Sequence, residues 1–78
     1  MTKYVGLTDD PERRKREHGN PLDWWEYRFE TEQQARRWER NMLAREGFVG
    51  QPGGRGWHYG YVYTITEQTD QETEKGTE

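Results

Sequence analysis

The scarcity of aliphatic side chains constrains this sequence more than any other feature. Leu, Ile and Val occupy only a few positions, whereas the 78 residues include four Trp, five Tyr and two Phe. A buried aromatic ring removes roughly 150 to 250 Å² from water, so a few rings can replace many aliphatic side chains if the Tyr hydroxyls and Trp N–H groups find partners. Since a chain of this size cannot support two cores, we expect one domain with a largely aromatic core.

Composition also limits the kinds of site. The sequence has no Cys, and its only His residues are His18 and His58, so it predicts neither a disulfide framework nor a structural zinc site. No apolar run approaches the roughly 20 residues that span a bilayer, and no signal-peptide pattern precedes the first strand pattern. We therefore expect a cytoplasmic protein without a membrane partner.

The charges are unevenly distributed. The net charge of -3 comes from residues 69–78, which we predict to be a disordered acidic tail beyond a domain at residues 1–68. The rest of the chain is neutral, so nucleic-acid binding would depend on local clusters of basic side chains. The candidates lie in the two predicted helices: Arg13, Arg14, Arg16, Arg36 and Arg40.

Three segments show strand patterning. Residues 3–7 and 57–68 are rich in strand-forming residues, and in residues 23–30 the side chains of Trp25, Tyr27 and Phe29 alternate with those of the opposite face. Tyr59, Tyr61, Tyr63 and Ile65 share one face of the last segment. The glycine-rich residues 50–56 have the composition of a flexible connector, because no helix follows them and the phosphate-loop motif is absent.

Two segments carry helix signals. Asp10 can cap a short helix from Pro11 to about His18, and Pro11 suits its first position. Thr31 and Gln34 have capping-box spacing before a helix over residues 32–46 that Gly47 ends. The order β-α-β-α-β predicts an α+β (split α/β layer) fold, with two helices packed on a three-stranded mixed or antiparallel sheet.

Both helices contain residues that break the expected pattern. In the second helix, Glu39 falls within the arc of the apolar residues, where it is either a rim carboxylate paired with a neighbouring Arg or a metal ligand. In the first helix, Arg14 and His18 share a face with Pro11 and there is no aliphatic core residue. That helix could equally be a solvated connector with surface charge.

Two stretches resemble the GIY-YIG nuclease superfamily. Residues 4–18 (YVGLTDDPERRKREH) resemble its Tyr-Ile-Gly strand, Thr-containing turn and Glu-Arg-Arg helix, which precede Glu-His. Residues 29–40 (FETEQQARRWER) resemble the family's second helix, in which an Ala lies four residues before the metal-binding Glu. Glu39 occupies the position of that Glu.

The family's first strand, Gly-Ile-Tyr, is absent before Tyr4. Residues 61–66 (YVYTIT) resemble it instead, with Tyr63 at the position of its Tyr. We therefore expect a circularly permuted GIY-YIG core in which the glycine-rich loop is the new connection. A permutation of this kind preserves contacts where the ends of the cut hairpin lie close together at the surface.

The resemblance implies hydrolysis of DNA phosphodiester bonds with one weakly bound Mg²⁺ or Mn²⁺ held by Glu39. Its implied catalytic residues are Tyr4, Tyr63, Arg14, His18 and Glu39. A protein partner or homodimer would supply specificity, because so short a chain has no separate recognition region.

Two alternatives remain open from the sequence. One is a non-catalytic nucleic-acid- or protein-binding module that keeps the GIY-YIG-like fold. The other is a structural domain in which Glu39 and Arg14 form an internal salt bridge.

Overall fold

A computed structural model describes residues 1–52 and 54–66. Among these residues, the elements follow in the order β1 (Lys3–Thr8), α1 (Pro11–Glu17), β2 (Trp25–Arg28), α2 (Glu32–Leu43), β3 (Phe48–Val49) and β4 (Tyr59–Thr64). The fold is α+β, as predicted. No helix in this described part is long and apolar enough to cross a membrane. The predicted acidic tail and the predicted domain end at residue 68 lie outside the described residues.

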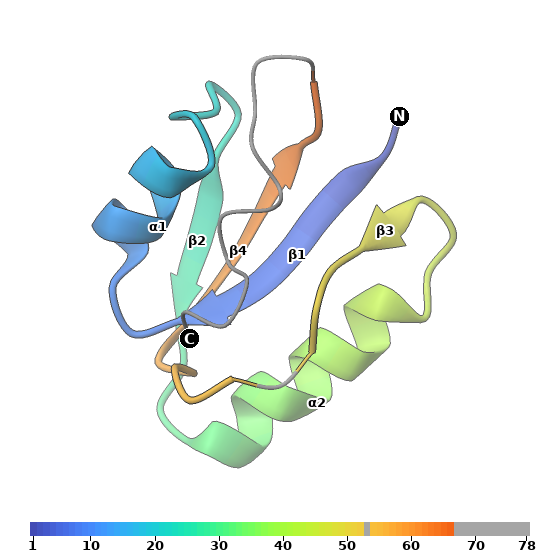
Figure 1. Cartoon of the computed structure of the whole chain (residues 1–78). Helices are drawn as coiled ribbons and strands as arrows, with labels where there is room; N and C mark the ends of the chain where they lie inside the picture. The colour runs from blue at the N-terminus through green and yellow to red at the C-terminus, as the bar shows by residue number, and fades with distance from the viewer. Residues whose placement is uncertain (53, 67–78) are drawn as a thin grey trace.

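The sheet is mixed and has the strand order β2-β4-β1-β3 (Figure 1). β4 is antiparallel to both of its neighbours, β2 and β1, whereas β3 is parallel to β1. The prediction of three strands is wrong, because Phe48 and Val49 pair with Lys3 and Tyr4 as a fourth strand. Two residues are too few for a period-two pattern, so only tertiary pairing reveals this strand.

Both predicted helix starts are confirmed. The Asp10 side chain accepts a hydrogen bond from the Arg13 N–H at 3.1 Å, and Pro11 is the first helical residue. The hydroxyl of Thr31 accepts from the Gln34 N–H at 3.1 Å. Each cap satisfies one of the N–H groups that the first turn of a helix leaves without an intrahelical partner.

α2 ends earlier than the predicted residue 46. Ala44 is its C-cap, and Gly47 adopts a φ of 88°, a left-handed conformation that glycine tolerates best. This turn brings the Gly47 carbonyl to the Lys3 N–H, which donates to it at 2.8 Å. The helix ends early because the chain must turn back to place β3 beside β1.

The pleat of the sheet separates two faces. Tyr4 is the register partner of Tyr63, and Gly6 of Tyr61, so these residues share one face. We call it the α1 face, because His18 at the end of α1 packs against these tyrosines. The opposite face, which carries Leu7 and contacts α2, is the α2 face.

The α2 face holds the apolar part of the core. Leu7, Phe29 and Ala35 form a buried cluster here, and Trp38 and Trp57 pack around it. Close packing here depends on Gly60, since a Cβ at this position would lie 2.6 Å from the Trp38 ring. The predicted aromatic core is therefore confirmed on both faces of the sheet.

Candidate functional site

The centre of the α1 face is a cluster of four rings, Tyr4, His18, Tyr61 and Tyr63, which we call the tyrosine–histidine cluster. The Tyr63 hydroxyl lies 2.7 Å from His18 Nδ1, and the Tyr61 hydroxyl lies 3.2 Å from His18 Nε2. The Tyr4 ring centroid is 5.0 Å from that of His18. His18 thus joins two residues of the last strand to the first strand.

Local backbone features place these rings together. His18 is the C-cap of α1, and the left-handed Gly19 and Asn20 then reverse the chain. Gly6 leaves the space that the Tyr61 ring fills, because any Cβ on Gly6 would overlap that ring. Trp24 stacks on the other side of Tyr61, with ring centroids 4.5 Å apart. The cluster is therefore closed by its neighbours.

Burial sets the chemistry of this cluster. His18 and Tyr63 have no exposed surface, and Tyr61 is 1% exposed. A neutral imidazole has one donor and one acceptor nitrogen, so one tyrosine hydroxyl donates to His18 and the other accepts from it. Buried hydroxyls and imidazoles need such partners, because an unmade hydrogen bond in the core is costly. The arrangement can hold a proton or pass it between two hydroxyls.

Arg14 lies one turn before His18. It is 3% exposed, and its Nη1 lies 2.9 Å from Glu17 Oε1. The shared face predicted for Arg14 and His18 is confirmed, since both side chains are buried. The interpretation of α1 as a solvated connector is wrong for this face, because burial of an Arg and a His replaces the usual aliphatic contacts.

Glu39 occupies a separate place on α2. Its exposure is 3%, which confirms the predicted position on the inner arc of the helix. Burial raises the pKa of the Glu39 carboxyl, and the charges of Arg36 and Arg40 oppose this shift. Its ion pair is with Arg36, whose Nη1 lies 3.9 Å from Glu39 Oε1. The sequence also allowed Glu39 to be a carboxylate at the rim of the core, paired with a neighbouring Arg. The pairing is present, but Glu39 is buried and does not lie at the rim.

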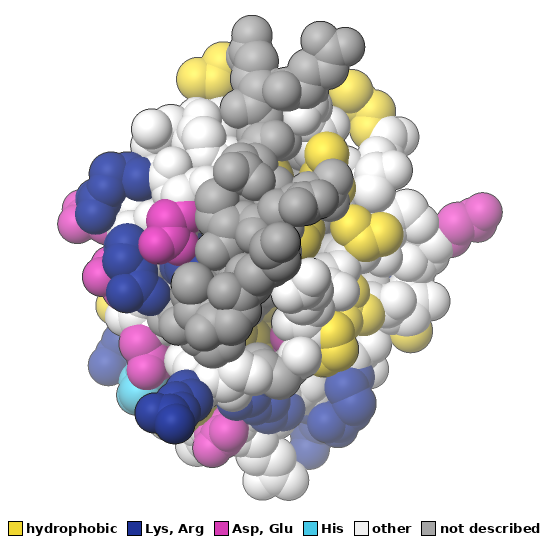
Figure 2. All heavy atoms as spheres, viewed as in Figure 1, with side chains coloured by type: hydrophobic (Ala, Val, Ile, Leu, Met, Phe, Trp, Pro, Cys, Tyr) yellow, Lys and Arg dark blue, Asp and Glu magenta, His cyan; other side chains and the backbone are white. Residues whose placement is uncertain are grey.

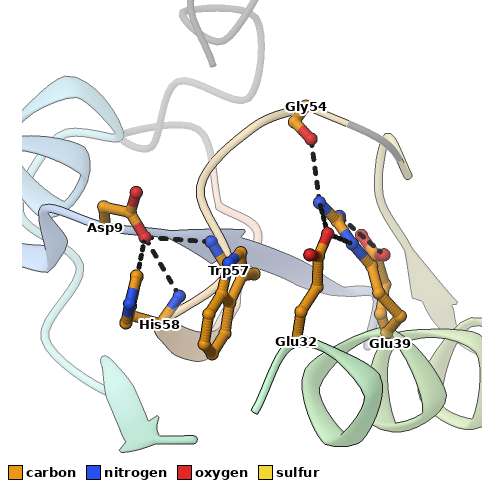
Figure 3. A network of polar contacts seen from close by, with 7 residues as sticks. Asp9, Glu32, Glu39, Gly54, Trp57 and His58 are labelled. Atoms are coloured by element: carbon orange, nitrogen blue, oxygen red, sulfur yellow. Dashed lines mark hydrogen bonds and ion pairs between the residues drawn. The ribbon is translucent and has the colours of Figure 1, made fainter. Parts of the chain in front are cut away.

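Arg36 connects this carboxylate to the loop before β4. Its Nη2 donates to the Gly54 carbonyl at 2.9 Å and lies 3.2 Å from Glu32 Oε2 (Figure 3). Figure 3 shows Glu32 and Glu39 approaching the guanidinium group from the same helix. Arg36 is therefore engaged in structure, which reduces its availability as the predicted nucleic-acid contact.

The predicted site residues divide between the two faces of the sheet. Tyr4, Tyr63 and His18 come together, with Arg14 one helical turn away, whereas Glu39 belongs to the helix on the α2 face. The salt bridge between Glu39 and Arg14 expected for a structural domain is not formed, because Glu39 pairs with Arg36. Each charge pairs within its own helix, since the helices approach the sheet from opposite faces.

A divalent cation would find one carboxylate here. Among residues 1–52 and 54–66, no group of three or more His, Asp or Glu side chains is arranged to hold a metal ion. Glu39 still fits the donor type, because Mg²⁺ prefers oxygen ligands and keeps several waters. Its desolvated charge, only partly compensated by Arg36, would gain from a cation. Water and substrate phosphate would have to supply the other ligands.

The other candidate basic residues lie at the surface or near it. Arg16 and Arg40 are exposed, and Arg13 Nε lies 3.6 Å from Glu17 Oε2. Figure 2 shows Lys and Arg side chains over the α1 side of the molecule, with Asp and Glu side chains between them. The acidic side chains interrupt the basic ones on that side, so a phosphate contact there would involve a few separate side chains.

The sequence interpretation assigned no role to Asp9 or His58, but they form a clamp with the backbone of the last loop. Asp9 Oδ1 accepts from the N–H groups of Trp57 and His58 at 3.0 and 3.1 Å, and His58 Nδ1 also contacts it (Figure 3). Hydrogen bonding to His58 lowers the pKa of Asp9. The sequence signal that could have predicted this contact is an Asp directly after a strand, since Asp side chains often accept hydrogen bonds from loop backbone.

The sequence also gave Tyr61 no function beyond strand formation. Its ring alternates onto the same face as Tyr63, so its proximity to His18 followed from the period-two pattern once His18 was placed on that face. Trp24, on the opposite face from Trp25, stacks on Tyr61 and Tyr63 and covers the cluster.

Comparison with known proteins yields no relative: no protein-family model matches the chain, and no curated protein or solved structure is similar to it.

Proposed function

We propose that this domain is a GIY-YIG-like nuclease that hydrolyses DNA phosphodiester bonds. The observation that carries the proposal is the tyrosine–histidine cluster. The resemblance names Tyr4, His18 and Tyr63 as catalytic residues, and they meet in one buried group although Tyr63 lies far from the others in sequence. An aromatic core alone would bury the two tyrosines, but it does not account for the hydrogen bond between Tyr63 and His18.

The strand arrangement supports the same proposal. β4 lies antiparallel beside β1, with Tyr63 opposite Tyr4. We propose that β4 takes the place of the strand that opens the family's core, moved to the other end of the chain by circular permutation. β3 has no counterpart in the expected three-stranded sheet, so it would be an addition outside the permuted core.

The proposed roles follow from position and chemistry. Arg14, whose planar guanidinium can offer two donors at once, would contact the scissile phosphate. The hydroxyl of Tyr63 or Tyr4 would position the attacking water, and His18 would accept its proton through the hydroxyl to which it is hydrogen-bonded. Glu39 would hold Mg²⁺ or Mn²⁺, which when bound supplies charge neutralisation and a lower pKa for water. Because Glu39 lies on the helix that covers the α2 face, the DNA would have to reach around the edge of the sheet for this cation to serve the phosphate that Arg14 contacts.

The test is a cleavage assay on labelled single-stranded, duplex and branched DNA with millimolar Mg²⁺ or Mn²⁺. We expect metal-dependent cleavage that Glu39→Gln and Arg14→Lys each reduce roughly 10²-fold or more. Glu32→Gln is the matched control, because Glu32 also pairs with Arg36 on α2 but is exposed. Circular dichroism checks the fold of each variant. Equal activity of Glu39→Gln and Glu32→Gln would refute the metal-binding role.

A non-catalytic nucleic-acid-binding module is the second candidate. It is favoured by the complete burial of His18 and by the ion pair that already occupies Glu39. Fluorescence anisotropy with the same DNA separates the two functions. Salt-dependent binding without cleavage, weakened by Arg13→Gln and Arg16→Gln and unaffected by Glu39→Gln, would identify the binding module.

A further inference from the structure

β2 forms one edge of the sheet, and its outer side carries no strand from the described residues. All four of its residues, Trp25 to Arg28, are exposed. Trp25 and Tyr27 are 48% and 56% exposed, and their rings are nearly parallel at a centroid distance of 6.3 Å. An edge strand with apolar side chains is a template for pairing with another strand.

The hydrogen bonds to β4 fix which residues of β2 face outward. The Phe29 N–H donates to the His58 carbonyl at 2.7 Å, so Phe29 is turned toward β4. In an antiparallel ladder the hydrogen-bonding residues alternate, so Tyr27 and Trp25 are also turned toward β4. The backbone N–H and C=O groups of Glu26 and Arg28 therefore point to the open edge.

These two residues limit how β2 could pair with a copy of itself. An antiparallel, two-fold symmetric pair must place outward-facing residues opposite each other. The possible central pairs are Glu26 with Glu26, Arg28 with Arg28, or Glu26 with Arg28 of the second copy. The first two put like charges face to face, whereas the third makes two opposite-charge pairs.

We propose that a second copy of this chain binds at the β2 edge, with Glu26 opposite Arg28 of the second copy and Tyr27 on the two-fold axis. Charge complementarity under this symmetry is what selects a second copy as the occupant. Trp24 Nε1 donates to Glu26 Oε1 at 2.7 Å, so the new Arg would pair with Oε2. The two sheets become one eight-stranded sheet.

The pairing has a consequence for both faces. The two-fold axis is perpendicular to the joined sheet, so both copies turn their α1 faces to the same side. On the other side, each Trp25 lies opposite Phe29 of the second copy, which extends the aromatic surface of the α2 face across the axis. This inference does not depend on the proposed nuclease function, because it uses only β2 and its charges.

Analytical ultracentrifugation of the full chain from micromolar to millimolar concentration tests the dimer. Glu26→Arg and Arg28→Glu each create like-charge pairs and are expected to weaken dimerisation at least about tenfold. The double variant Glu26→Arg/Arg28→Glu restores opposite charges, so its dissociation constant should return to within about threefold of the original. The proposal is overturned if the chain is a monomer at every concentration, or if none of the three variants changes the dissociation constant of the dimer.

Single cysteines test the register separately, since the chain has no Cys of its own. Tyr27→Cys places two thiols across the axis in a non-hydrogen-bonded pair, where the Cα atoms are about 4.5 Å apart. We expect rapid disulfide-linked dimers from this variant and slow ones from Glu26→Cys, the matched neighbour on the same strand. Faster crosslinking by Glu26→Cys would refute the register, and no crosslinking by either would refute the interface.

Discussion

The two faces of the sheet are both aromatic, but they are organised differently. On the α1 face, His18 and three tyrosines are buried together, and both ring nitrogens of His18 are hydrogen-bonded, one to Tyr61 and the other to Tyr63. On the α2 face, Leu7, Phe29 and Ala35 form an apolar centre, and the aromatic surface then continues outward to exposed rings on β2. Similar strand patterns therefore give one core specified by hydrogen-bond geometry and one specified by apolar burial.

This difference teaches where substitutions should matter most. Apolar packing tolerates swaps of similar volume, whereas a buried polar network loses more when one member is removed, because its partners stay desolvated. The α1 face should therefore be the more sensitive of the two.

His18→Ala is expected to have the largest effect, a loss of about 3 to 4 kcal/mol in the free energy of unfolding. It removes a buried ring and takes one hydrogen-bond partner each from Tyr61 and Tyr63. Urea unfolding monitored by Trp fluorescence measures the change. Leu7→Ala, expected to cost about 2 to 3 kcal/mol, is the control on the α2 face. A smaller loss for His18→Ala than for Leu7→Ala would contradict the contrast between the faces.

Two glycine substitutions compare the tightness of packing. Gly6→Ala drives a methyl group into the Tyr61 ring, which is buried and hydrogen-bonded, so we expect a loss of about 2 to 3 kcal/mol. Gly60→Ala meets the ring edges of Trp38, which is only partly buried and can move, and of Phe29, which is buried, so about 1 to 2 kcal/mol is expected. Thermal unfolding of both variants under the same conditions tests which variant loses more stability. Equal losses would show that the two faces accommodate an added methyl group equally well.

Glu39→Gln should stabilise the protein by roughly 1 kcal/mol at pH 7, because it removes the burial of a charge. Burial raises the pKa of Glu39, so the folded state keeps this proton to higher pH than the unfolded chain does. Stability from this group is present below the ordinary value of 4.5 and is lost as the pH rises through the folded pKa. The difference between variant and original should thus vanish at pH 4.

Measuring the free energy of unfolding from pH 4 to pH 8 checks this sign, with Glu32→Gln as the exposed control on the same helix. A Glu39→Gln variant that is less stable at pH 7 would indicate that the ion pair with Arg36 outweighs the cost of burial. Greater stability combined with lost cleavage would instead identify a residue kept for function.

Asp9→Asn is expected to have the smallest effect, about 0.5 kcal/mol or less, because the group is largely exposed and solvent screens its interactions. Hydrogen bonding to His58 lowers the pKa of Asp9, so its contribution is present above the ordinary value of 3.8. It is lost as the pH falls through the folded pKa. Unfolding curves from pH 6 down to pH 2 should converge with those of the variant. Glu30→Gln controls for removing one exposed negative charge.

The fold class and most elements could be predicted, since they depend on local signals. The caps at Asp10 and Thr31 placed both helix starts correctly, and the alternation of Trp25, Tyr27 and Phe29 placed β2. β3 could not be predicted, because pairing with β1 creates a strand from two residues that carry no pattern. The early end of α2 could not be predicted either, because it is set by the tertiary pairing of β3 with β1 and not by local helix propensity.

The candidate site was predictable in parts. Alternation along the last strand placed Tyr61 and Tyr63 on one face, and helical spacing joined Arg14 to His18. That Tyr4 lies on the same face as Tyr63 follows only from the pairing of β1 with β4. Helical spacing also put Glu39 on the inner arc of α2, but it carries no information on which sheet face that helix covers. The division of the site between two faces is a long-range property, so no local pattern could supply it.

The position of β4 also bears on how the protein is made. This strand lies between β2 and β1, yet it is the last of the described strands to be synthesised. A nascent chain that stops before residue 59 has no partner to hold β1 and β2 in one sheet, because each pairs with β4. Assembly of β1, β2 and β4 into one sheet must therefore wait until β4 has left the ribosome, and until then the aromatic segments of β1 and β2 lack the strand that pairs with both.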